Sequence, residues 1–184
     1  MRSVFAAALF AASVLILASP AGRADDSATP SWMKVDAGAK SVQITLVAGW
    51  NNSNGALNYN GYYKGAITVR IPAGWRVDIK FSNHDGMLPH SVLATKAYGE
   101  GNIPQQAGSA EVAINKAYSR DPEAGIMNGQ QDDVPFTASD PGEFWLMCGV
   151  PPHGQQGMWI KLSIVAGLDR PGIVVAAGSE PGWK

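Results

Sequence analysis

The residues with the most distinctive chemistry lie near the end of the chain, at Cys148, His153 and Met158. They supply a thiol, an imidazole and a thioether at the spacing Cys-x4-His-x4-Met. Glycine and proline residues between them favour a tight loop, so a single turn would bring all three side chains together. Thiolate and thioether sulfurs select copper, and imidazole also suits this metal. The segment therefore predicts a copper site.

A second histidine, His90, lies in the segment 88–92, which reads Leu-Pro-His-Ser-Val. Under strand alternation His90 shares a face with the valine two residues later, so its ring can face the protein interior. Two imidazoles and one thiolate, with a weakly bound methionine, make up the donor set of blue-copper electron-transfer sites. The predicted ligands of one copper ion are His90, Cys148, His153 and Met158.

Such a site is suited to carrying electrons one at a time. Cu(I) prefers soft ligands in low coordination, whereas Cu(II) prefers harder, tetragonal surroundings. A mixed site of sulfur and nitrogen ligands is a compromise between the two, so it changes little when the metal changes oxidation state. Because little rearrangement is needed, electron transfer is fast. The prediction is therefore an electron carrier and not an enzyme.

Three other functions rest on weaker patterns. Copper delivery or storage, the main alternative, needs clustered methionines, but the further methionines are scattered at Met33, Met87, Met127 and Met147. A multicopper oxidase or nitrite reductase needs a second copper centre, and only His84 remains of the three histidines. We expect His84 to be exposed. A metal-free adhesion domain leaves the one cysteine, Cys148, without a role.

The N-terminus is typical of an export signal. Arg2 supplies a positive charge, residues 4–18 are apolar apart from one serine, and Gly-Arg-Ala at 22–24 offers small residues for cleavage. We predict a signal peptide at 1–24 and one mature domain at 25–184, periplasmic or on the outer face of the cytoplasmic membrane. The alternative is an uncleaved membrane anchor. In an oxidising compartment an unpaired cysteine is a liability, and a bound metal ion would protect its thiol.

The composition indicates a single all-β domain. A length of 184 residues, 46% of them hydrophobic, suits one domain, and 14 basic against 15 acidic residues argue against a nucleic-acid partner. Short alternating segments between Gly, Pro and Asn clusters predict an antiparallel β-sandwich or barrel. The predicted strands are 42–47, 66–71, 76–83, 89–95, 110–114, 142–148 and 158–165. The pattern is weak over 98–140, and the short extension after Val165 is either disordered or a docking segment.

The last two predicted strands explain how the ligands converge. Cys148 is in phase with the apolar residues of 142–148, and Met158 is in phase with those of 158–165. Both sulfur atoms should therefore face the core at the same end of the sheet, with His153 at the tip of the loop between them.

Together these features resemble those of sulfocyanins, which are members of the cupredoxin family, with rusticyanin as an alternative relative. The resemblance rests on the Cys-x4-His-x4-Met loop, on Leu-Pro-His-Ser at 88–91 and on Ile-Pro-Ala-Gly-Trp at 71–75. It covers the chain from about Val42 to Val165. It implies a Greek-key β-sandwich holding one copper ion that alternates between Cu(I) and Cu(II). It also implies that His90, Cys148 and His153 are equatorial ligands and that Met158 is the axial ligand.

The resemblance further implies a respiratory role, with a cytochrome or terminal oxidase as redox partner. Sulfocyanins are frequently membrane-anchored, so membrane association stays open here. We expect a monomer in which His153 is the port for electrons and the segment 149–152 is an apolar docking patch. We expect Ser91 to hydrogen-bond between the two ligand-bearing segments, and Trp159 to shield the metal from water.

Overall fold

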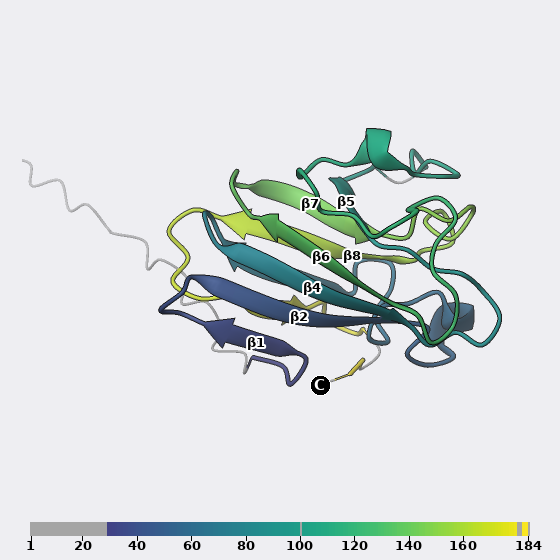
Figure 1. Ribbon diagram of the computed structural model, residues 1–184, viewed down its shortest axis with the longest axis horizontal. Helices are drawn as coiled ribbons and strands as arrows, with labels where there is room; N and C mark the ends of the chain where they lie inside the picture. The colour runs from purple at the N-terminus through teal and green to yellow at the C-terminus, as the bar shows by residue number, and fades with distance from the viewer. Residues whose placement is uncertain (1–28, 100, 180–181, 184) are drawn as a thin grey trace, which may run out of the picture.

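The computed structural model describes residues 29–99, 101–179 and 182–183. Two β-sheets pack face to face (Figure 1). The first sheet contains, in spatial order, β1 (Met33–Asp36), β2 (Ser41–Ala48), β4 (Arg76–Asn83) and β6 (Gln131–Thr137). The second contains β5 (Leu93–Lys96), β7 (Gly142–Met147), β8 (Trp159–Val165), β3 (Ile67–Pro72) and β9 (Gly172–Val175). Two 3₁₀ turns complete the elements, η1 (Ser53–Ala56) and η2 (Ser109–Glu111).

The predicted signal peptide at 1–24 lies outside the described residues. Over the part of the chain that is described, we find no helix with the length and apolar character needed to cross a membrane.

Side-chain alternation along the strands builds the core between the sheets. In β4, Val77, Ile79 and Phe81 are buried while the residues between them face outward at least in part. The same alternation buries Ile44 and Leu46 in β2, which lies beside β4. From the second sheet, Val69 of β3 and Leu162 of β8 are buried in the same core cluster, so both inner faces are apolar. The predicted all-β Greek-key sandwich is confirmed.

The strand directions differ from the expected antiparallel arrangement. β2 pairs with β4 in parallel, and β3 pairs with β8 in parallel, while the other pairs are antiparallel. The reason lies in the path of the chain, which leaves the first sheet after β2, forms β3 in the second sheet and returns as β4. After two crossings between sheets, β4 runs in the same direction as β2.

Most of the predicted strands exist, but 110–114 is not one of them. This segment begins inside η2 and pairs with β5 through an isolated bridge between Val112 and Thr95. The strand predicted at 89–95 is also shorter than expected, because His90 pairs separately with Ile126 before β5 begins. The stretch 98–140 contributes β6, whose inward Val134 and Phe136 alternate with acidic and proline residues that hid the pattern.

The segment after Val165 is part of the sandwich. Its strand β9 pairs antiparallel with β3 and buries Ile173. Further on, the Trp183 ring stacks on Trp50 with 4.5 Å between ring centroids, and the Trp183 carbonyl accepts a hydrogen bond from Trp32 Nε1 at 2.8 Å. These contacts place β9 and Trp183 against the body of the domain, so the expected disorder is wrong for these residues. A docking role for this segment stays a prediction.

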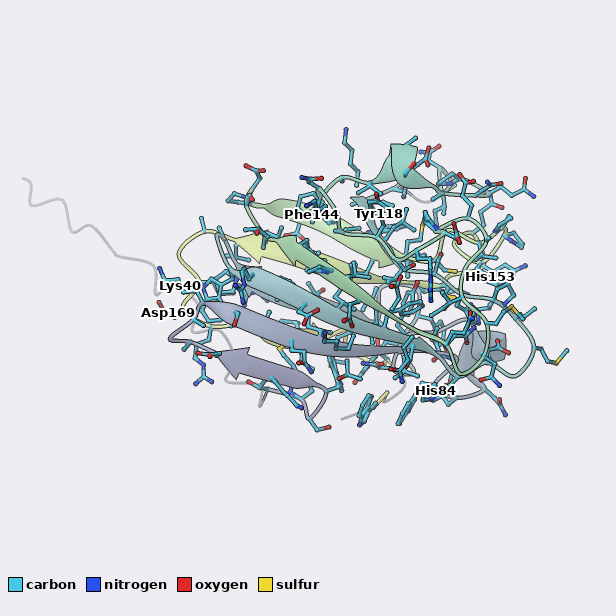
Figure 2. All side chains as sticks on the ribbon, viewed as in Figure 1. Lys40, His84, Tyr118, Phe144, His153 and Asp169 are labelled. Atoms are coloured by element: carbon cyan, nitrogen blue, oxygen red, sulfur yellow. The ribbon has the colours of Figure 1, made fainter. Side chains whose placement is uncertain are left out.

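The fold brings the candidate ligands to one end of the sandwich. β7 ends at Met147 and β8 begins at Trp159, so the segment 148–158 forms the connecting loop at that end. His90 precedes β5, which is the neighbour of β7 in the same sheet. Figure 2 shows His153 and His84 at this end, with Lys40 and Asp169 at the opposite end.

The role of β9 can be tested with two residues of the same strand. Ile173→Ala should lower the free energy of unfolding by about 2 kcal/mol, because it removes buried methyl groups. Val174→Ala changes an exposed side chain and should stay within about 0.5 kcal/mol. Denaturant unfolding of both variants measures the difference, and equal effects would show that β9 does not contribute to the core.

Candidate metal centre

Three buried side chains converge at this end of the sandwich. One donor atom from each of His90, Cys148 and His153 lies within 4.8 Å of the other two. The His90 and His153 rings are 4.9 Å apart between centroids, and Cys148 Sγ lies 3.5 Å from His153 Nδ1. The donor atoms of a thiol and two imidazoles thus lie close together, as the sequence predicted for these three residues.

Backbone hydrogen bonds close the loop that carries two of these groups. Cys148 N–H donates to the Met158 carbonyl, and Met158 N–H donates to the His153 carbonyl, both at 3.0 Å. Gly149 is required because a Cβ there would lie 2.0 Å from the Ala107 carbonyl oxygen. The loop is therefore held against the segments around it rather than extended into solvent.

His90 is fixed by a short antiparallel bridge. Its N–H donates to the Ile126 carbonyl at 3.0 Å, and Ile126 N–H donates back at 2.7 Å. Gly125 has a φ of 75°, and a Cβ there would lie 2.8 Å from the His90 carbonyl oxygen. The chain therefore needs glycine at this position to approach the ligand strand so closely.

The two ring nitrogens of His90 have different surroundings. Nε2 lies 3.0 Å from Asp85 Oδ2, whereas Nδ1 is buried without a hydrogen-bond partner. A buried polar atom without a partner is unfavourable unless a ligand completes its contacts. His90 belongs to the same cluster as Cys148 and His153, so the residues present fit a copper ion that would bind this free nitrogen.

Ser91 connects the two ligand-bearing segments. Its N–H donates to Cys148 Sγ at 3.4 Å, and its Oγ lies 3.7 Å from the same sulfur. The Gly149 N–H donates to Ser91 Oγ at 2.9 Å. The predicted role of Ser91 is confirmed by these bonds. Donors of this kind favour a thiolate over a thiol, and they hold the sulfur in place.

Burial sets the protonation of the metal-free site. It lowers the pKa of His153 to about 4, assisted by the neighbouring His90, and lowers the pKa of His90 although Asp85 opposes the shift. Burial also raises the pKa of the Cys148 thiol, against the hydrogen bonds from Ser91. At neutral pH both rings are therefore neutral with lone pairs available, and binding a copper cation would release the thiol proton.

Met158 and Trp159, which are neighbours in sequence, lie on opposite faces of the sheet. Met158 is fully buried and belongs to the same core cluster as Cys148. Trp159 instead stacks on Trp145 with 3.7 Å between ring centroids, in a separate cluster with Met147. The prediction that Trp159 shields the metal is wrong, because successive strand residues point to opposite faces.

The surface over the site differs from the predicted docking patch. His153 is only 5% exposed, and Gly149 and Val150 are buried, which leaves Pro151 as the exposed residue of 149–152. The prediction of a patch formed by the whole segment is therefore wrong. His84 is exposed and stands outside the cluster, as expected.

Exposed apolar side chains come instead from two other loops. Met87 is 84% exposed and Met127 is 52% exposed, with Leu88 beside Met87 also exposed. Asn83 Nδ2 joins these loops by donating to the carbonyls of Leu88 and Ile126, at 2.8 and 2.7 Å. One signal was available in the sequence, since both loops adjoin segments that hold His90. It did not show that residues so far apart in the chain lie together.

Comparisons with known proteins agree on one family. A family profile described as the sulfocyanin (SoxE) domain matches residues 28–175. The sulfocyanin of Sulfolobus acidocaldarius is 27% identical over 139 residues, which cover 74% of this chain and 69% of that protein.

Similar chains also occur among solved structures. Auracyanin A, titled a "blue" copper protein from Chloroflexus aurantiacus, has 18% identity and a TM-score of 0.47, over 68% of this chain and 99% of its own. Rusticyanin from Thiobacillus ferrooxidans has 18% identity and a TM-score of 0.46, over 73% of this chain and 86% of its own.

Proposed function

This chain belongs to the sulfocyanin family, and we propose that it shuttles single electrons in a respiratory chain outside the cytoplasm. It is a blue-copper electron-transfer protein that binds one copper ion. The proposed ligands are His90, Cys148, His153 and Met158. The observation that carries the proposal is the buried cluster of one thiol and two neutral imidazoles, in which His90 Nδ1 has no other partner.

Each residue has a distinct task in this proposal. Cys148 supplies the thiolate, which Ser91 stabilises, and the two histidines supply neutral nitrogens. Bound copper supplies the one-electron couple. The ligands are held by the Ile126 bridge and by the backbone bonds of the loop, so they keep their positions when the charge at the site changes. A site that does not rearrange is suited to fast electron transfer.

Met158 is proposed as the weak axial ligand. Three features support this role: its position at the end of the Cys-x4-His-x4-Met loop, its complete burial, and its backbone bond to Cys148. Its placement in the same core cluster as Cys148 agrees with the strand phase read from the sequence. An axial thioether contributes little to holding the copper but tunes its reduction potential.

A redox partner is proposed to dock over the exposed loops at this end, with the protein acting as a monomer. Met87, Leu88 and Met127 present apolar side chains there, and Pro151 adds to them from the ligand loop. Small apolar contacts suit weak and short-lived encounters, which a shuttle needs in order to release its partner. A cytochrome or terminal oxidase is the proposed class of partner.

Export is supported by the sequence. The apolar N-terminal segment and the cleavage motif ending at Ala24 are typical of exported proteins. The single cysteine is consistent with this location, because a metal ion would protect it in an oxidising compartment.

The copper site is tested by a visible absorption spectrum after Cu(II) is added to the metal-free protein. We expect an intense thiolate-to-copper band in the wild type and its loss in Cys148→Ser, which removes the thiolate with little change of volume. His84→Gln alters the histidine outside the cluster and should keep the band. A colourless wild-type protein, or equal copper binding without Cys148, would contradict electron transfer and favour copper delivery.

The axial role of Met158 is tested against a second buried methionine. Met158→Leu should keep a blue band but raise the reduction potential, because loss of the axial thioether favours low-coordinate Cu(I). Met147→Leu is the matched control, since Met147 is equally buried but lies on the other face of the sheet. Protein-film voltammetry measures both, and equal potentials for the two variants would remove Met158 from the ligand set.

The docking surface is tested by the rate of electron exchange between oxidised and reduced protein. Met87→Glu places a charge in the exposed patch and should slow the exchange roughly tenfold, because two like charges then meet in the encounter. Ala166→Glu adds the same charge after the far end of β8 and should have a much smaller effect. NMR line broadening in mixtures of the two oxidation states gives the rate. Similar rates for both variants would argue against this docking face.

A further inference from the structure

One carboxylate is buried against the proposed copper ligands. Asp85 is 8% exposed, and its Oδ2 lies 3.0 Å from Nε2 of His90. A buried charge is unfavourable unless it is well hydrogen-bonded. A backbone carbonyl or a water molecule would also satisfy a ligand histidine, so a carboxylate at this position is a specific feature of the chain.

The two oxygens of Asp85 have separate partners. Oδ1 accepts hydrogen bonds from the N–H groups of Met87 and Leu88, at 2.9 and 3.2 Å. Oδ2 is directed to His90. The loop itself is pinned, since Asp85 N–H donates to Asn83 Oδ1 at 2.8 Å. One oxygen therefore orders the loop, and the other is held ready for the imidazole.

The surrounding backbone leaves Asp85 little room to move. A Cβ at Gly49 would lie 2.7 Å from the Asp85 nitrogen and 2.8 Å from its Cβ. Gly49 also has a φ of 64°, which favours glycine. The end of β2 therefore packs directly on this residue. This packing and the hydrogen bonds to Oδ1 together hold the carboxylate beside the His90 ring.

An ionised carboxylate accepts hydrogen bonds and donates none, so the proton of neutral His90 must lie on Nε2. The lone pair is then on Nδ1, the nitrogen that is buried without a partner. The contact selects the tautomer that binds a metal and sets the orientation of the ring. It also places a negative charge one imidazole away from the copper, where Cu(II) gains more from it than Cu(I) does.

We propose that Asp85 is a positioning residue that fixes the metal-binding tautomer of His90 and lowers the reduction potential of the copper site. The second part rests on the proposed function, whereas the first part holds for the metal-free protein as well. The carboxylate thereby makes the His90 ring more electron-rich than it would be without this contact. Asp85 opposes the preference for Cu(I) that the apolar surroundings create.

The test compares two variants that each remove one negative charge. Asp85→Asn should weaken Cu(II) binding roughly ten- to hundredfold, with a smaller effect on Cu(I). A tenfold loss of Cu(II) affinity relative to Cu(I) affinity raises the potential of a one-electron couple by about 59 mV. Asp169→Asn removes an exposed carboxylate at the opposite end of the sandwich and should leave the potential nearly unchanged. Voltammetry of the copper-loaded full chains measures both.

A second measurement needs no copper. The ¹⁵N chemical shifts of the His90 ring in the metal-free wild type should show the proton on Nε2, and Asp85→Asn should yield a mixture of tautomers. A proton on Nδ1 in the wild type, or a potential that Asp85→Asn shifts no more than Asp169→Asn does, would overturn the proposal. Failure of the proposed function would appear differently, as a wild type without a blue band and with the Nε2 tautomer intact.

Discussion

The burial of one thiol beside two neutral imidazoles is the constraint on which the rest of the structure depends. Cys148 and His90 lie in the interior, where neither a thiolate nor an unpartnered ring nitrogen is favourable alone. A single cation resolves both problems, because it neutralises the sulfur and takes up the nitrogen lone pair. The surrounding bonds hold the donors at a common focus before any metal arrives.

Two hydrogen-bond networks have opposite effects on the electron density at the metal ligands. Ser91 donates to the sulfur, which draws charge away from it, while Asp85 accepts from His90, which adds charge to the ring. The first favours Cu(I) and the second favours Cu(II), so the balance between them contributes to the potential. Both networks use residues of one short stretch of chain, because His90 and Ser91 are adjacent and Asp85 precedes them in the same loop.

The sequence predicted those features that follow from local alternation and spacing. The phase of Cys148 and Met158 along their strands was enough to place both in the core. The same rule contradicts a shielding role for Trp159, which neighbours Met158 and so points to the other face. Features that depend on long-range packing were not predictable, such as β9 against β3, or Asp85 against His90, whose partnership requires the path of a loop.

A preassembled set of one thiolate and two imidazoles should hold a single copper ion with little change between its oxidation states. X-ray absorption at the copper edge of the oxidised and reduced protein tests this directly. We expect one short copper–sulfur contact and two copper–nitrogen contacts in both states, with nearly the same distances. A Cu(II) site dominated by oxygen or further nitrogen ligands, or one that loses its sulfur on oxidation, would contradict it.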